Sequence, residues 1–144
     1  MGNPLPTDCQ QVIPYLIVKD IEAELQFIRQ AFGGLEREVV RDEQGVGTHG
    51  EITIGDSLIM MGRAREDYPP MPCMLYLYVE DTDATYKKAL AAGGTSLMEP
   101  QDQFYGDRNA GVKDSSGIQW WIATRKENLS TEEIQRRSLK KEKG

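Results

Sequence analysis

The sequence predicts an α+β domain made of two copies of one β-α-β-β-β module, followed by a C-terminal helix. Three observations support this fold: an internal repeat at a fixed offset, glycine and aspartate breaks at matching places in both copies, and a helix-start signal near the end of the chain. At 144 residues, with 39% hydrophobic and 28% charged residues, the chain suits one packed domain.

The repeat aligns residues 15–33 with residues 76–94 at a constant shift of 61 and without a gap. A β-branched and aromatic run opens each copy and predicts a strand. An aspartate, Asp20 or Asp81, then ends the strand and caps a helix. Paired glycines close each helix, at 33–34 and 93–94, where a left-handed residue is needed.

Three further strands are expected after each helix, because Gly and Asp breaks divide the remaining apolar runs at turns. They lie at 36–42, 48–55 and 57–62 in the first copy, and at 95–100, 108–113 and 118–124 in the second. The proline-rich segment 64–72 is the expected linker between modules 12–63 and 73–127, which together form one domain over 12–127. We expect a flexible lead at 1–11 and a C-terminal helix within 128–144, where Ser130 and Glu133 form a capping box.

The charge distribution argues against a nucleic-acid partner. The net charge is −6, but residues 125–143 carry seven Lys or Arg and four Asp or Glu, which leaves ten basic and nineteen acidic residues elsewhere. The excess of acidic residues outside 125–143 would repel the phosphate backbone of a nucleic acid. No apolar run approaches the ~20 residues that span a bilayer, and the start, MGNPLPTDCQQ, lacks the pattern of a secretory signal. We therefore expect a cytoplasmic protein without a membrane partner.

The repeated stretches, together with HGEITIGDSLIMMG and FYGDRNAGVKDSSGIQWWIAT, resemble the vicinal oxygen chelate superfamily, in its glyoxalase/bleomycin-resistance branch. The resemblance covers residues 12–127; Ser115 departs from it, since the family usually has proline in that turn. It implies a curled mixed sheet around a cleft and a homodimer whose ligand cavities are completed across the interface.

Enzymes of this superfamily hold a divalent metal through His, Gln or Glu on the first and last strands of each module. The matching positions here are Ile13, Met74, Trp121 and one residue within 59–61, with Met60 at its centre. None offers a hard or borderline cation a suitable donor. The sequence therefore predicts no metal and no other cofactor. The only histidine, His49, alternates with Glu51 on one strand, which gives two donors without an evident third.

Aromatic and methionine side chains take the place of the metal ligands on the expected cleft face. Rings stack on planar ligands and methionine adapts to their shape, so this set predicts a pocket for a small molecule. Tyr105 and Tyr68 lie on expected loops at the cleft mouth, and Arg108 could bind an acidic group of a ligand, pair with Asp107 or pair with a partner subunit. The candidate ligand-binding residues are Ile13, Tyr15, His49, Glu51, Met60, Met74, Tyr76, Tyr78, Tyr105, Arg108 and Trp121.

Three functions follow from these expectations. The favoured one is a non-catalytic protein that binds a small aromatic or amphipathic molecule, as bleomycin-resistance members sequester an antibiotic. The alternative is a divergent metal-dependent lyase, isomerase or dioxygenase that uses His49 and Glu51 as ligands or acid/base groups. A third possibility is an interaction module whose cleft is filled by its own side chains.

Overall fold

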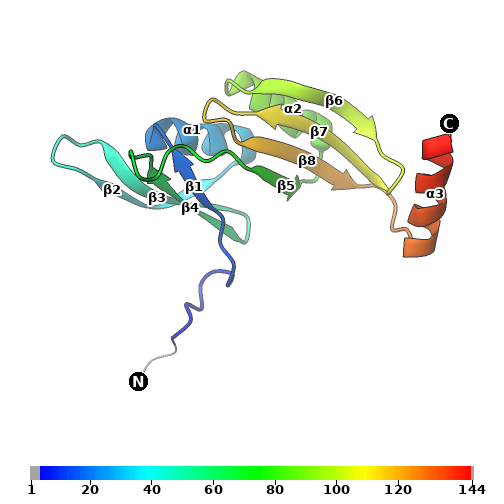
Figure 1. Cartoon of the computed structure of the whole chain (residues 1–144), viewed down its shortest axis with the longest axis horizontal. Coiled ribbons are helices and arrows are strands. Elements are labelled where there is room, and N and C mark those ends of the chain that lie inside the picture. The colour runs from blue at the N-terminus through cyan, green and yellow to red at the C-terminus, as the bar shows by residue number, and fades with distance from the viewer. Residues whose placement is uncertain (1–3, 144) are drawn as a thin grey trace.

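The computed structural model describes residues 4–143, and it confirms the α+β fold with two tandem modules and a C-terminal helix (Figure 1). The first module consists of β1 (Tyr15–Val18), α1 (Ile21–Phe32), β2 (Leu35–Arg41), β3 (Gly47–Ile54) and β4 (Ser57–Arg63). The second consists of β5 (Met74–Tyr78), α2 (Thr82–Ala91), β6 (Thr95–Asp102), β7 (Asp107–Lys113) and β8 (Gln119–Arg125), and α3 (Thr131–Lys143) follows it.

The eight strands form two four-stranded mixed sheets with the same topology. Their strand orders are β1-β4-β3-β2 and β5-β8-β7-β6. In each sheet the first strand of the module pairs in parallel with the last, and the other pairs are antiparallel. The helix between the first two strands supplies the crossover that a parallel pair needs.

Both module helices begin as the sequence predicts. The Asp20 carboxylate accepts a hydrogen bond from the Ala23 amide at 3.1 Å, and Asp81 accepts one from Ala84 at 3.1 Å. The ends differ slightly: Gly33 itself caps α1 with φ 69°, whereas Ala92 caps α2 and Gly93 then takes the positive φ of 105°. The repeat therefore preserves the start of the helix more strictly than its end.

One core joins the two modules. Helices α1 and α2 contact each other and lie on the same side of the sheets (Figure 1). Trp120 of the second module packs against α1, with ring centroids 4.8 Å from Phe32 and 6.5 Å from Phe27. Because both helices cover the same side, the opposite face of each sheet stays open, and alternate strand residues point toward it.

Polar contacts tie the segments that flank the two modules to them, and Arg137 of α3 donates to the Phe104 carbonyl at 3.2 Å. In α3, the Glu133 amide donates to the Ser130 hydroxyl at 3.1 Å, while the Glu133 side chain pairs with Arg136 and Arg137 instead of returning to the cap. Residues 4–14 form no helix or strand, but the Gln10 amide group binds both backbone groups of Leu58. The expected lead at 1–11 starts with residues 1–3, which lie outside the described residues. Over 4–143, no helix is long and apolar enough to cross a membrane.

Candidate functional site

The open face of the first sheet carries the residues that the sequence assigned to a cleft. In the strand register Tyr15 lies opposite Met60, and Met60 lies opposite Glu51, so these three side chains share one face. Ile59 and Met61 point the other way and are 4% and 0% exposed in the core. The register thus places Met60, and not its neighbours, at the last-strand position on the open face.

A short chain of polar groups runs across this face. The Tyr15 hydroxyl lies 3.2 Å from His49 Nδ1, and His49 Nε2 lies 3.1 Å from Glu51 Oε2. Glu51 is buried, and Arg37 Nε lies 3.7 Å from its other oxygen. The side chains of His49 and Glu51 therefore contact each other. This series of polar groups reaches solvent through the phenol of Tyr15, which is 52% exposed.

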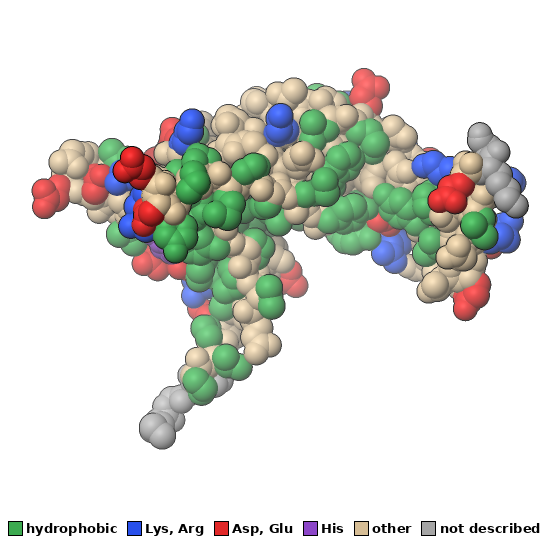
Figure 2. Space-filling model, viewed as in Figure 1, with side chains coloured by type: hydrophobic (Ala, Val, Ile, Leu, Met, Phe, Trp, Pro, Cys, Tyr) green, Lys and Arg blue, Asp and Glu red, His purple; other side chains and the backbone are tan. Residues whose placement is uncertain are grey.

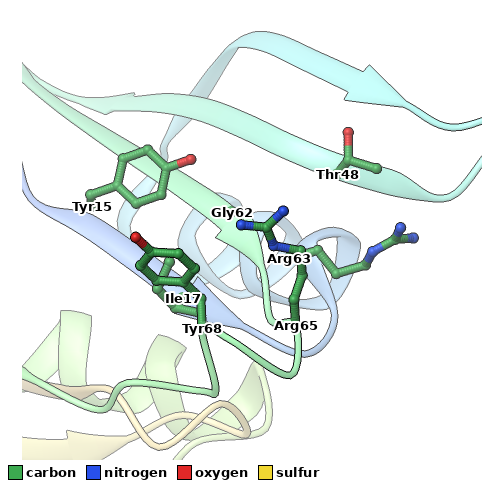
Figure 3. A pocket seen from close by; sticks show the side chains of 7 residues that line it. All are labelled: Tyr15, Ile17, Thr48, Gly62, Arg63, Arg65 and Tyr68. Atoms are coloured by element: carbon green, nitrogen blue, oxygen red, sulfur yellow. The ribbon is translucent and has the colours of Figure 1, made fainter.

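A cavity of about 590 Å³ opens beside Tyr15. Figure 3 shows the rings of Tyr15 and Tyr68 on one side of it and the guanidinium groups of Arg63 and Arg65 on the other. Tyr68 comes from the linker, which is held along β1 by the hydrogen bond from the Met71 amide to the Ile17 carbonyl at 3.1 Å. The full lining is Tyr15, Ile17, Thr48, Gly62, Arg63, Arg65 and Tyr68.

Gly62 lets the phenol of Tyr15 lie close to β4. A Cβ atom at position 62 would come within 2.9 Å of the Tyr15 hydroxyl oxygen. The second sheet has the same arrangement of a glycine beside an aromatic ring, since a Cβ at Gly111 would lie 2.7 Å from Cη2 of Trp121. In both sheets a glycine on the open face makes room for an aromatic ring.

The open face of the second sheet is organised around a buried carboxylate. Asp107 is 3% exposed and accepts hydrogen bonds from the hydroxyls of Tyr76 and Tyr78, both at 2.8 Å, and from Arg125 Nε at 2.9 Å. Burial alone would raise the pKa of Asp107, but these three donors outweigh it and hold the pKa below its usual value. Burial is also the main reason why the pKa of Tyr76 is raised.

The network continues to the loop before β7. Asn109 Nδ2 donates to the hydroxyls of Tyr105 at 2.7 Å and Tyr76 at 3.1 Å, and Gln103 donates to Asn109 Oδ1 at 3.0 Å. These polar groups satisfy one another. The second face therefore offers aromatic surface with few free donors.

The structure brings most of the predicted site residues together, in two groups. Tyr15, His49, Glu51 and Met60 form the first group, and the second comprises Met74, Tyr76, Tyr78, Tyr105 and Trp121. Ile13 precedes β1 and is partly buried outside the lining of the cavity.

Arg108 lies apart from both groups. Its guanidinium pairs with Asp83 of α2 at 2.9 Å and with Asp102 at 3.2 Å. Of the options for Arg108, the pairing with Asp107 is wrong, because neighbouring strand residues point to opposite faces and Asp107 pairs with Arg125 instead.

The donors on the open faces do not fit a divalent metal. Methionine and tryptophan stand at three of the positions that the resemblance marks as metal ligands, and Ile13 stands at the fourth. Within residues 4–143 no three His, Cys, Asp or Glu side chains gather as a metal-binding group. His49 and Glu51 bind each other and bring no third donor with them.

Five of the residues that line the cavity were not among the predicted site residues: Ile17, Thr48, Gly62, Arg63 and Arg65. Ile17 shares a strand face with Tyr15, so alternation carried the signal for it. Arg65 lies in the proline-rich linker, of which only Tyr68 is expected at the cleft mouth. Nothing in the local sequence indicates that this segment folds back along β1.

Comparisons with known proteins agree with this architecture. An uncharacterized protein of Mycobacterium bovis is 29% identical over 136 residues, covering 85% of this chain and 88% of that protein. The crystal structure of TioX from Micromonospora sp. ML1 is similar with a TM-score of 0.70 and 20% identity, covering 81% of this chain and 98% of that one. The crystal structure of a glyoxalase/bleomycin resistance protein/dioxygenase family enzyme from Burkholderia phytofirmans PsJN is similar with a TM-score of 0.65 and 22% identity. The match covers 77% of this chain and 94% of that one.

The family comparison is broader than these single relatives. The sequence profile of the Glyoxalase/Bleomycin resistance protein/Dioxygenase superfamily matches residues 10–122, which is most of the chain and both modules. The topology of the sheets and the structural neighbours agree with that match. This chain belongs to the Glyoxalase/Bleomycin resistance protein/Dioxygenase superfamily.

Proposed function

We propose that this chain binds a small aromatic or amphipathic molecule beside Tyr15 and holds it without chemical change, as in antibiotic sequestration. The observation that carries the proposal is the cavity between Tyr15 and Tyr68, whose volume of about 590 Å³ lies within the usual range for small-molecule sites. Half-exposed tyrosines give a planar ligand large contact areas at low cost in side-chain entropy, because each ring has few rotatable bonds.

The chemistry of the open faces favours binding over reaction. The family's metal positions carry thioether, indole and alkyl groups, which can contact a ligand but cannot polarise it. The carboxylate of Asp107 is occupied by Tyr76, Tyr78 and Arg125. A ligand on these faces meets rings, sulfur and a few hydroxyls.

We further infer that the working form is a homodimer in which the open faces of two copies meet. Tyr15, Met74, Tyr76 and Tyr78 are 47–61% exposed in the single chain, a large apolar area for a free surface. Hydrophobic side chains gather over the middle of the molecule (Figure 2). A second copy would cover part of this area and close the cavity on its open side.

A thermal-shift screen with planar aromatic compounds tests the proposal. A compound at 100 times its Kd adds about 2.7 kcal/mol to the free energy of unfolding, which is readily detected. The Tyr15→Ala and Tyr68→Ala variants should lose the shift. Leu139→Ala, which removes a side chain of similar exposure (49%) on α3, should keep it. Equal shifts in all four proteins would contradict the proposed site.

A second candidate function is a divergent lyase or isomerase of the same superfamily. The observation that favours it is the Tyr15–His49–Glu51 chain, in which a proton could pass between a bound molecule and the buried carboxylate. His49→Ala distinguishes the two functions. It would abolish turnover in an enzyme, whereas a binding protein would keep its affinity to within a few-fold.

A further inference from the structure

The cavity beside Tyr15 has a marked charge asymmetry. Arg63 and Arg65 both line it, and none of the described residues in its lining is acidic. The chain as a whole has a net charge of −6, so two arginines without a lining carboxylate run against the general composition. A site of this kind favours a ligand that carries negative charge.

Arg65 is the freer of the two arginines. Its side chain is 65% exposed, and its only ion pair within residues 4–143, with Asp67, spans 3.5 Å between Nε and Oδ1, which is too long for a strong hydrogen bond. Most of its guanidinium donors are therefore open to a ligand. The exposed ion pair with Asp67 contributes little binding energy, so a ligand that displaced Asp67 would lose little.

The backbone fixes Arg65 next to an aromatic ring. The Arg65 amide donates to the Tyr68 carbonyl at 2.8 Å, and the Tyr68 amide donates back to the Arg65 carbonyl at 3.1 Å. The guanidinium carbon of Arg65 lies 5.4 Å from the centroid of the Tyr68 ring. A single turn therefore presents a cation and a stacking surface together.

Arg63 adds a second cation at the end of β4. Its Nη1 donates to Asp42 Oδ2 at 3.0 Å, which leaves the other guanidinium donors unassigned. Asp42 is itself anchored by the amides of Val46 and Gln44, and it lies outside the lining of the cavity. Asp42 thus holds Arg63 in position while the rest of the guanidinium remains available.

We infer that the ligand is an anionic aromatic molecule, whose ring contacts Tyr15 and Tyr68 and whose carboxylate, sulfonate or phosphate group binds Arg65 and Arg63. This inference rests on the proposed function and adds the ligand's charge to it. Guanidinium groups bind such oxygens through charge-assisted hydrogen bonds, which are stronger than the neutral ones that the tyrosine hydroxyls make.

Two fluorescent probes with one aromatic skeleton test the charge requirement: 8-anilinonaphthalene-1-sulfonate, which is anionic, and N-phenyl-1-naphthylamine, which is neutral. Wild-type protein should bind the sulfonate about tenfold more tightly than the neutral probe. Arg65→Gln should remove most of that preference by weakening the sulfonate's binding far more than the neutral probe's, and Arg63→Gln should reduce the preference in the same direction. Arg136→Gln, which neutralises an arginine of matched exposure (64%) on α3, should change neither Kd.

The possible outcomes separate this inference from the proposed function. If both probes bind equally and Tyr15→Ala weakens both, the site binds aromatic molecules but the charge requirement is wrong. A sulfonate preference that persists in Arg65→Gln and Arg63→Gln also overturns it. If wild-type protein binds neither probe, the inference and the proposed pocket both fail for this aromatic skeleton.

Discussion

At the scale of single residues, the most unusual group is a buried acid between the modules. Glu24, on α1, is 1% exposed, and neither of its side-chain oxygens has a hydrogen-bond partner of good geometry among the described residues. Burial raises its pKa to about 9, and the neighbouring carboxylate of Asp114 adds to the effect. Glu24 is therefore protonated in the folded chain at neutral pH.

This proton predicts an uncommon dependence of stability on pH. Above pH 4.5, the ordinary pKa of Glu24, the unfolded chain releases the proton that the folded chain keeps, so the free energy of unfolding falls as pH rises toward about 9. Glu24→Gln should flatten this fall and raise the free energy of unfolding at pH 7.5 by about 1–3 kcal/mol. Urea unfolding of both proteins at pH 5.5, 7.5 and 9 measures the free energy of unfolding and its dependence on pH.

A matched control for this prediction lies on the same helix. Glu22 is half-exposed and pairs with Arg41 at 2.8 Å, so Glu22→Gln should leave the slope between pH 5.5 and pH 9 unchanged. The lowered pKa values of Asp42, Asp83 and Asp107 act below pH 4 and do not enter this window. An unaltered slope in Glu24→Gln would contradict the assignment.

At the scale of elements, the spacing of strand residues explains why the sequence predicts so much of the open faces. Alternation groups Met74 with Tyr76 and Tyr78, which do share the open face of β5. It also groups Ile13 with Tyr15, but Ile13 precedes β1 and lies outside the lining of the cavity. What alternation cannot give is register between strands. Whether Met60 or Met61 lies on the open face depends on the pairing of β4 with Glu51 of β3, which the residues of β4 do not encode.

Gly62 of β4 supports a prediction about one element. Gly62→Ala would push a Cβ toward the Tyr15 hydroxyl, the far end of a movable side chain, so we expect a loss of stability below about 1 kcal/mol. The displaced phenol would narrow the cavity and weaken aromatic ligands at least several-fold. Melting temperatures with and without ligand measure both effects. Full binding in Gly62→Ala would show that the position of the Tyr15 ring is unimportant.

At the scale of the whole molecule, the repeat accounts for the architecture, whereas contacts between distant segments account for the details of the site. The shift of 61 predicts two modules of equal topology, and the sheets have it. Asp114, which raises the pKa of Glu24, lies 90 residues away from it in the sequence, and Arg65 reaches the cavity only because the linker runs back along β1. Local sequence patterns carry no signal for either arrangement.

The proposed homodimer gives a whole-molecule prediction. Light scattering after size-exclusion chromatography should report twice the 16.2 kDa of one chain. Met74→Glu, which places a charge at a 61% exposed position on the open face, should shift the protein to the monomer, because an unpaired charge in an apolar interface is costly. Leu139→Glu on α3 should not. A monomeric wild type at all concentrations would contradict the prediction.

In the proposed function, the cavity beside Tyr15 binds a small molecule and releases it chemically unchanged. The most direct measurement is equilibrium dialysis of the wild-type protein with a compound from the thermal-shift screen, followed by mass spectrometry of the compound after prolonged incubation. We expect about one compound per chain, recovered chemically unchanged, with binding lost in Tyr15→Ala. Conversion of the compound at a rate that depends on His49 would contradict the claim.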